Sequence, residues 1–135
     1  MIKRKAILVD SACNYDSLYK RHLCIDENNY NEIWTLAKKK IKRFTYIVQR
    51  TLTQNGLYWD CYGQEVINGK SKNVSAIKFF DIDNTRIYCK EMSDNRGNFY
   101  IICSILLMSK KVQKNNKPII EIIEKISSYE YEIVR

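Results

Sequence analysis

FYIICSILLMSKKVQK, at residues 99–114, is the stretch that decides how this chain folds. Residues 99–108 are almost entirely apolar and do not alternate with polar residues, a pattern typical of a central strand covered on both faces of a sheet. The chain then turns abruptly basic over Ser109-Lys110-Lys111-Val112-Gln113-Lys114. A buried strand that ends in lysines makes a rigid base for a phosphate-binding site, because lysine binds phosphate as a point charge.

Two strands with polar alternation come before the apolar strand. They cover residues 74–80 and 86–92, and residues 81–84 between them predict a turn in which an Asp or Asn side chain bonds the backbone. Residues 93–98 then close a hairpin onto the apolar strand. This order of strand, turn, strand and hairpin predicts a sheet built mainly from neighbours in the sequence.

Alternation in the second of these strands places Arg86, Tyr88 and Lys90 on one face, with Ile87 and Cys89 on the other. If the first face covers a helix, its charged residues are edge residues whose heads reach out of the core. If it is concave and open, a guanidinium and an ammonium are available to hold one phosphate. The sequence leaves these two interpretations open.

A long helix is predicted from Asn29 to the stop signal at Asn55-Gly56. Asn29 followed by Glu32 is a capping pattern, and apolar residues then recur at three- and four-residue steps. The opposite face is basic, especially over residues 38–43, and we interpret it as a solvated face. The apolar stripe consists of Ile33, Ala37, Ile41, Phe44 and Val48.

The other segments complete a single α+β domain over residues 1–135. Residues 1–9 predict a first strand, residues 10–28 are polar and irregular with a short helix at 15–22, and residues 57–67 predict a strand or broken strand. A short helix rich in isoleucine begins at Pro118. Two tyrosines follow it in a polar tail, at Tyr129 and Tyr131.

The charge balance predicts a polyanionic partner. The chain has 23 Lys and Arg against 15 Asp and Glu, a net charge of +8. Such a charge favours nucleic acid, an acidic protein or an anionic membrane surface, and does not choose among them. Ten tyrosines add stacking surface suited to single-stranded RNA. The alternative is that most of these tyrosines are ordinary strand and interface residues.

Several classes of function have little support. The sequence predicts no metal site and no cofactor: His22 is the only histidine, and four glycines provide no phosphate loop. A Ser–His–Asp site would need His22 from the irregular segment, while a cysteine paired with His22 stays open. Five dispersed cysteines indicate a reducing compartment, and the lack of 18 consecutive apolar residues argues against a membrane span. We therefore expect a cytoplasmic protein.

The basic run and its surroundings resemble a known family. Lys110-Lys111-Val112-Gln113-Lys114 is followed by Pro118 and by Glu121-Ile122, and Arg86 opens the earlier strand in Thr85-Arg86-Ile87-Tyr88. Over roughly 55 residues this order is similar to the C-terminal half of the RelE/HigB superfamily of type II toxin–antitoxin toxins, in particular the HigB-like phage-derived branch. The resemblance implies a compact antiparallel sheet with a long helix packed on it and a short C-terminal helix.

The family's activity is cleavage of mRNA, usually in the ribosomal A site. The ribose 2′-hydroxyl attacks the adjacent phosphate, and basic side chains stabilise the transition state without a metal. The resemblance and the basic residues suggest a catalytic set and an RNA-binding set. No general base is evident, because relatives carry it near the C-terminus where this chain has Lys117 or isoleucines. The expected catalytic residues are Arg86, Lys90 and Lys111, and the expected RNA-binding residues are Lys78, Tyr88, Lys110, Lys114 and Tyr129.

The resemblance also implies partners. We expect a small cognate antitoxin, acidic or with a helix-turn-helix, together with mRNA and the ribosome. In that setting the basic helix face at residues 38–43 could contact ribosomal RNA or the antitoxin. One alternative is a non-catalytic RNA-binding or antitoxin-like module on the same fold. Another is a protein-interaction domain whose basic helix face binds an acidic partner.

Overall fold

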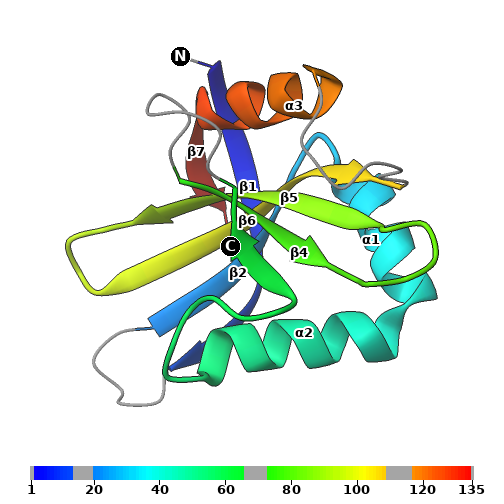
Figure 1. Ribbon diagram of the computed structural model, residues 1–135. Helices are drawn as coiled ribbons and strands as arrows, with labels where there is room; N and C mark the ends of the chain where they lie inside the picture. Colours follow the sequence, from blue (N-terminus) through cyan, green and yellow to red (C-terminus); the bar gives the residue numbers. More distant parts are fainter. Residues whose placement is uncertain (1, 14–19, 66–72, 109–116, 135) are drawn as a thin grey trace.

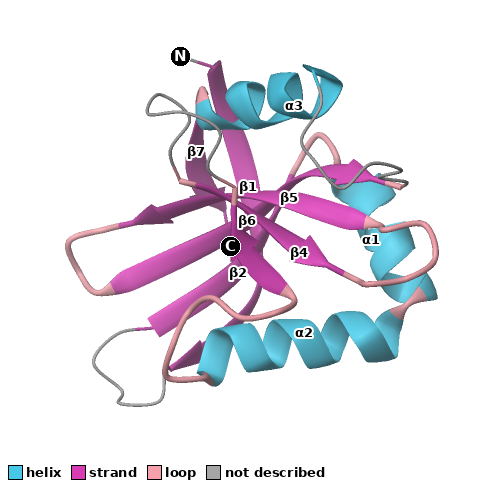
Figure 2. Cartoon of the chain, viewed as in Figure 1, coloured by secondary structure: helices cyan, strands magenta, loops and turns pink. Residues whose placement is uncertain are grey.

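The computed structural model describes residues 2–13, 20–65, 73–108 and 117–134 (Figure 1). Within these ranges seven strands form one sheet, and three helices pack on its faces (Figure 2). The elements are β1 (Ile2–Cys13), β2 (Lys20–Asp26), α1 (Tyr30–Lys39), α2 (Ile41–Thr53), β3 (Tyr62–Gln64), β4 (Val74–Lys78), β5 (Arg86–Ser93), β6 (Asn98–Leu107), α3 (Lys117–Ser127) and β7 (Tyr129–Val134).

The apolar strand β6 lies at the centre of the sheet, whose strand order is β3-β4-β5-β6-β2-β1-β7. It pairs antiparallel with β5 and parallel with β2. Residues 100–104 are all buried, since one layer of apolar side chains covers each face of the sheet. The prediction of a central strand covered on both faces is confirmed.

Each face of the sheet has its own core. Helices α1 and α2 bury Ile33, Phe44 and Ile47 against one face, in a cluster that includes Ile87 and Ile101. On the other face, α3 buries its isoleucine stripe in a second cluster with residues of β1, β2, β4, β5 and β6. Figure 1 shows α2 and α3 on opposite sides of the sheet. The stripe of α3 consists of Ile119, Ile123 and Ile126.

The expectation of an antiparallel sheet is wrong, because the sheet is mixed. β2 runs parallel to β6, and β1 runs parallel to β7. The remaining neighbours β1–β2, β3–β4, β4–β5 and β5–β6 are antiparallel. A parallel pair cannot be joined by a tight turn, so each of these two pairs brings together segments that lie far apart in the sequence.

The expected polar tail is in fact a strand. Residues 129–134 read Tyr-Glu-Tyr-Glu-Ile-Val, and this two-residue period buries Tyr129 and Tyr131 while Glu130 and Glu132 stay exposed. Tyr131 Oη donates to Asp26 Oδ2 at 2.6 Å and also lies 2.9 Å from Ser104 Oγ. These contacts tie β7 to the middle of the sheet.

A second strand was hidden in the segment expected to be irregular. β1 continues to Cys13 and residues 20–26 form β2, so His22 lies in a strand rather than in a helix; residues 14–19 are outside the described residues. The sequence did not predict this strand, because Arg21, His22 and Asp26 are polar residues that are nevertheless buried. Each finds partners from distant segments, such as Arg21 Nη1, which donates to Thr51 O at 2.8 Å.

The predicted long helix is divided at Lys40 into α1 and α2. Lys40 has φ −118° and ψ 42°, and it lies within a run of basic residues whose like charges at three- and four-residue spacing disfavour a continuous helix. Ile41, placed by the sequence on the buried stripe, is 45% exposed for this reason. The capping pattern is also wrong: Asn29 makes no side-chain cap, and its Nδ2 donates to Ser104 O at 2.8 Å.

The remaining predictions hold in outline. β4, β5 and α3 lie where the sequence placed them, and Thr85 N donates to Asp81 Oδ1 at 2.8 Å in the turn before β5. The aromatic segment at 57–65 is mostly irregular and contains only the short strand β3. No helix in the described part of the chain is long and apolar enough to cross a membrane.

Candidate nucleic-acid interface

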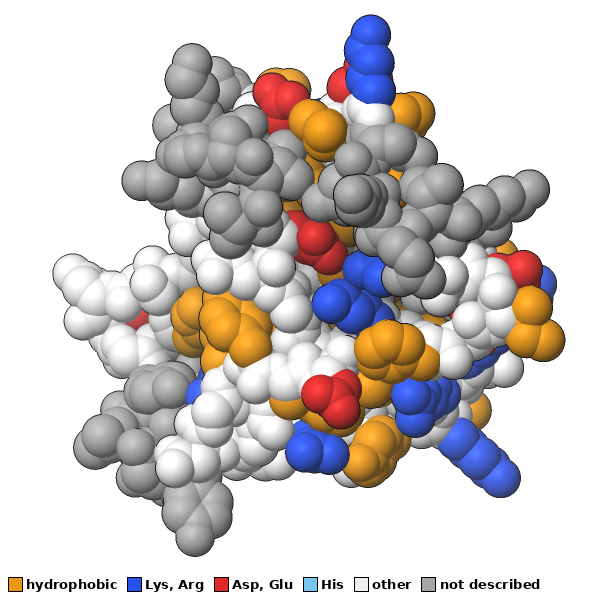
Figure 3. Space-filling view, in the orientation of Figure 1, with side chains coloured by type: hydrophobic (Ala, Val, Ile, Leu, Met, Phe, Trp, Pro, Cys, Tyr) orange, Lys and Arg blue, Asp and Glu red, His pale blue; other side chains and the backbone are white. Residues whose placement is uncertain are grey.

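The face predicted from the alternation of β5 is present. Ile87 and Cys89 belong to the core under α1 and α2, whereas Tyr88 belongs to the core under α3. Arg86 pairs with Lys78 of β4 across the antiparallel ladder, so these two cations are neighbours at one end of both strands. In Figure 3, Lys and Arg side chains lie in the middle of the visible face at the level of β4 and β5.

A glutamate that the sequence did not single out completes this group. Arg86 Nη1 lies 3.3 Å from Glu65 Oε1, and both side chains are largely buried, with 14% and 11% of their area exposed. Glu65 is held in place because its backbone N donates to Val74 O at 2.8 Å. We call Lys78, Arg86 and Glu65 the β4–β5 cluster.

The floor of the β4–β5 cluster is made of the smallest side chains available. Gly63 of β3 pairs with Ala76 of β4, which leaves room above the sheet. A Cβ placed on Gly63 would lie 3.1 Å from Lys78 Nζ, so the ammonium group occupies the space that this glycine leaves. A larger residue at position 63 would push the Lys78 head away.

Tyr88 is buried on the same face of the sheet, two residues from Arg86 along β5 and paired with Ala76. Its ring is fully buried, and its hydroxyl has no hydrogen-bond partner among the described residues. Burial raises the pKa of Tyr88 to about 12, with a further increase from Glu65 and an opposing effect from Arg86. The expected role of Tyr88 in binding RNA is therefore not supported, because no face of the ring is accessible.

Lys90 has a structural partner rather than an open position. Its Nζ donates to Ser127 O, in the last turn of α3, at 2.8 Å. The cation thus satisfies a carbonyl at the negative end of the helix dipole. Partial burial lowers the pKa of Lys90. The expected catalytic role of Lys90 is not supported, because its head is already bound inside the protein.

Tyr129 lies in another part of the molecule. It is 3% exposed in β7, edge-on to Tyr131, and the guanidinium of Arg4 lies 4.4 Å from the centre of its ring. Both its exposure and its position separate it from the β4–β5 cluster. Its expected role in binding RNA is not supported.

The predicted lysines Lys110, Lys111 and Lys114 lie outside the described residues. The basic run follows directly on Met108, whose carbonyl accepts a hydrogen bond from Thr85 Oγ1 at 3.1 Å. The last pair of the β5–β6 ladder joins Arg86 to Leu107. The run therefore begins within three residues of a position paired with Arg86.

A serine does lie next to His22, but the two do not form a Ser–His–Asp catalytic site. Ser11 Oγ lies 2.6 Å from His22 Nδ1, and His22 Nε2 lies 2.8 Å from Asn98 Oδ1. Asn98 Nδ2 donates to Asp94, so Oδ1 accepts from His22 Nε2–H and Nδ1 accepts from Ser11. Ser11 N is bonded to Asp10 and cannot serve as an oxyanion donor. We interpret these hydrogen bonds, from Ser11 through His22 to Asn98, as a structural link across β1, β2 and β6.

Another carboxylate is buried on the opposite face of the sheet. Tyr58 and Tyr62 donate to Glu91 at 2.8 and 2.5 Å, and Ser75 bonds Tyr62 at 2.6 Å. Burial and Glu91 raise the pKa of Tyr62 well above its usual value. Because no cation takes part in these contacts, this group offers nothing to a phosphate.

Within the described ranges, no group of three or more His, Cys, Asp or Glu residues could hold a metal ion.

No family model, curated protein or solved structure matches this chain.

Proposed function

We propose that this protein is a metal-independent endoribonuclease that acts as the toxin of a type II toxin–antitoxin module. The observation that carries the proposal is the β4–β5 cluster, in which the largely buried carboxylate of Glu65 contacts Arg86, and Lys78 lies across the strand pair from Arg86 and next to Gly63. The cluster supplies the general base that the sequence did not reveal. The resemblance of the neighbouring basic run to the RelE/HigB superfamily supports the toxin assignment.

The chemistry follows from the roles of these three side chains. Glu65 takes the proton of the ribose 2′-hydroxyl, and the 2′-oxygen attacks the adjacent phosphorus. Arg86 stabilises the charge that develops on the phosphate oxygens. The bond to the 5′-oxygen breaks, and Lys78 gives that oxygen a proton. The products are a 2′,3′-cyclic phosphate and a 5′-hydroxyl.

The Arg86–Glu65 contact describes the state before substrate binds. Arg86 Nη1 contacts one of the two carboxylate oxygens of Glu65, Oε1. A guanidinium has five N–H groups, so Arg86 can hold a phosphate while it still orients the carboxylate. The pair therefore positions base and cation on the same phosphodiester. The substrate would be mRNA on the ribosome in the cytoplasm, and an acidic or helix-turn-helix antitoxin would cover the basic surface.

A binding module without catalysis is the second candidate. The hydrogen bond of Lys90 to Ser127 favours it, since this bond removes one of the expected catalytic cations. Such a module would need only its basic surface. Substitution of Glu65 distinguishes the two candidates, because only the nuclease needs this carboxylate as a general base.

Induced expression tests the proposal. Wild-type protein should arrest growth and shorten mRNAs, and Glu65→Gln should reduce cleavage about 100-fold or more, because it removes a general base and keeps the shape. Arg96→Ala, in the exposed turn before β6, is the matched control and should remain toxic. A folded Glu65→Gln protein with full cleavage activity would contradict the mechanism. Growth arrest without any RNA cleavage would favour the binding module.

A further inference from the structure

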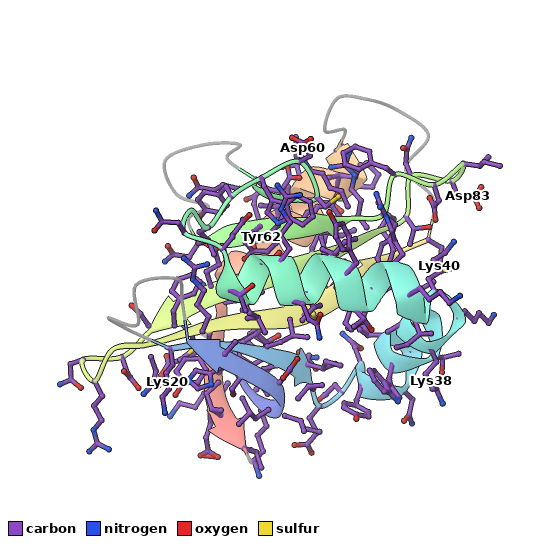
Figure 4. All side chains as sticks on the ribbon, turned by 90° about the horizontal axis from the view of Figure 1, so that it is seen from below. Lys20, Lys38, Lys40, Asp60, Tyr62 and Asp83 are labelled. Atoms are coloured by element: carbon purple, nitrogen blue, oxygen red, sulfur yellow. The ribbon has the colours of Figure 1, made fainter. Side chains whose placement is uncertain are left out.

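A second basic surface lies on the other side of the turn that joins β4 to β5. It is a groove of about 550 Å³ between the α1–α2 junction at residues 39–43 and residues 79–81. We call it the junction groove. Figure 4 shows its neighbourhood, with Lys40 at the helix junction and Asp83 in the β4–β5 turn at the same end of the molecule.

The groove is strongly cationic. Four of its lining residues are Lys39, Lys40, Lys42 and Arg43, and its one acidic residue is Asp81. Asp81 is neutralised by Lys40, whose Nζ lies 3.0 Å from Asp81 Oδ2. Three cations therefore remain in excess on a surface of a few residues.

Arg43 also anchors the wall of the groove. Its Nε donates to Phe79 O at 3.3 Å, and its Nη2 lies 3.6 Å from Cys61 Sγ. These contacts use two of the five N–H groups of the guanidinium. The side chain therefore fixes the β4–β5 turn against α2 and still has donors for a ligand.

An aromatic ring is exposed at the rim. Phe79 is buried and its ring lies 6.5 Å from that of Phe44, whereas the next residue, Phe80, is 57% exposed. Phe80 has φ 52°, in the left-handed region that aromatic residues rarely adopt. The bonds of Asp81 to Thr85 and Lys40 hold the backbone in this conformation. A strained backbone that presents a ring to solvent is a feature found at binding sites.

We propose that the junction groove binds a single-stranded segment of RNA, with one base stacked on Phe80 and the backbone phosphates neutralised by Lys39, Lys42 and Arg43. A ring among cations is the combination that single-stranded nucleic acid recognises, because every base has a face to stack and every nucleotide a charge. An acidic peptide would use the cations but would gain little from the ring. The inference rests on the proposed function for the identity of the substrate.

The position of the groove explains how one RNA strand would use it together with the β4–β5 cluster. Lys78 ends β4 and Arg86 begins β5, and the turn between them carries Phe80 and Asp81. The turn thus separates the cleavage site on one face of the sheet from the groove on the other. The groove would hold nucleotides that flank the scissile phosphate.

The test measures binding of a short fluorescent oligouridine that carries 2′-O-methyl groups and so cannot be cleaved. Phe80→Asn removes the ring, and because asparagine tolerates the left-handed region, the variant should be at least as stable as the wild type. We expect its affinity to fall about 5- to 160-fold, the range for loss of one stacked base. Phe80→Trp should retain binding. Lys42→Ala should reduce the salt dependence by about one phosphate contact, whereas Lys125→Ala on α3 should change it little.

Two outcomes would overturn the inference: Phe80→Asn that binds the oligonucleotide as the wild type does, or Phe80-dependent binding of polyglutamate without binding of RNA. The failure of the inference is distinguishable from that of the proposed function. Binding that depends on Phe80, together with cleavage that is absent or insensitive to Glu65, keeps the groove and removes the nuclease. Cleavage that depends on Glu65, together with binding that ignores Phe80, does the reverse.

Discussion

Arg86 and Glu65 are each largely buried, and each depends on the other for its charge to be tolerated there. A buried carboxylate that loses its cation retains the cost of leaving water. Arg86 is therefore not the ordinary surface arginine that its sequence context suggests. Its substitution should affect stability and activity together, and the two effects have to be measured separately.

Arg86→Ala should abolish toxicity and RNA cleavage, and it should lower the free energy of unfolding by about 1–3 kcal/mol because Glu65 is left unpaired. Urea denaturation and growth after induction provide the two measurements. The double variant Arg86→Ala/Glu65→Ala should recover part of the stability and remain inactive. A folded Arg86→Ala protein that is still fully toxic would remove Arg86 from the site.

Tyr88→Phe should stabilise the protein by about 1 kcal/mol, because it removes a buried hydroxyl that has no partner among the described residues. In the folded wild type the phenol of Tyr88 has a pKa of about 12, whereas in the unfolded chain the same phenol ionises near pH 10. Since the folded pKa is raised, stability is complete below pH 10 and decreases as the pH rises toward 12. Urea titrations at neutral and alkaline pH should show a smaller alkaline loss in the variant. If the variant and the wild type were equally stable at both pH values, the Tyr88 hydroxyl would have to be hydrogen-bonded in the folded protein.

At the scale of elements, the sequence predicts well where the pattern is local. β4, β5 and β6 follow from alternation and from one apolar run, and α3 follows from Pro118 and its isoleucines. β2 could not be predicted in this way, because Asp26 is buried by contacts with Arg4 and Tyr131, which lie 22 and 105 residues away. β7 does carry a local two-residue alternation, so the expectation of a polar tail there overlooked a signal that the sequence contains. A polar residue looks like a loop residue until its partner is known.

The site shows the same limit. Arg86 and Lys78 could be placed on one face from the two-residue period of their strands. Glu65 could not be found, because it follows a three-residue strand and meets Arg86 only through the pairing of β3 with β4. Lys90 was assigned to the correct face, but its bond to the end of α3 depends on how that helix packs.

β7 should be held by its hydrogen bonds as well as by its apolar contacts. Tyr131→Phe keeps the ring and removes the hydroxyl that donates to Asp26 and contacts Ser104, so we expect a loss of about 1–3 kcal/mol in urea denaturation. Arg4→Ala should cost more, because fully buried Asp26 then loses its salt bridge. Glu130→Gln, exposed on the same strand, is the control and should change stability by less than about 0.5 kcal/mol. A neutral Tyr131→Phe would mean that β7 is held by packing alone.

At the scale of the whole molecule, the net charge of +8 should govern affinity for RNA. Each neutralised phosphate releases counterions, so binding should weaken steeply as salt rises. Lys110→Ala and Lys111→Ala, in the basic run outside the described residues, should each reduce the salt slope by about one. Fluorescence titrations at several salt concentrations provide the measurement. An affinity that barely responds to salt would show that the charge serves another partner.

Cleavage should persist in excess EDTA and leave 2′,3′-cyclic phosphate ends. In the proposed mechanism the attacking group belongs to the substrate, and Arg86 and Lys78 carry the charge that magnesium carries in two-metal nucleases. The assay uses purified protein with ribosomes kept intact, and a ribosome-free RNA in parallel. Loss of activity with the chelator, its return with magnesium or manganese, and 5′-phosphate products would refute the mechanism.

The parallel pairing of β7 with β1 also determines when folding of the sheet can be completed. During synthesis β1 emerges first and β7 last, so the edge of the sheet beside β1 stays unpaired until almost the whole described chain has been made. Asp26, near the middle of the sheet, waits equally long for the hydroxyl of Tyr131. The sheet can therefore be completed only after β7 has been made. If the protein is a toxin as proposed, this delay gives an antitoxin time to bind before the fold is complete.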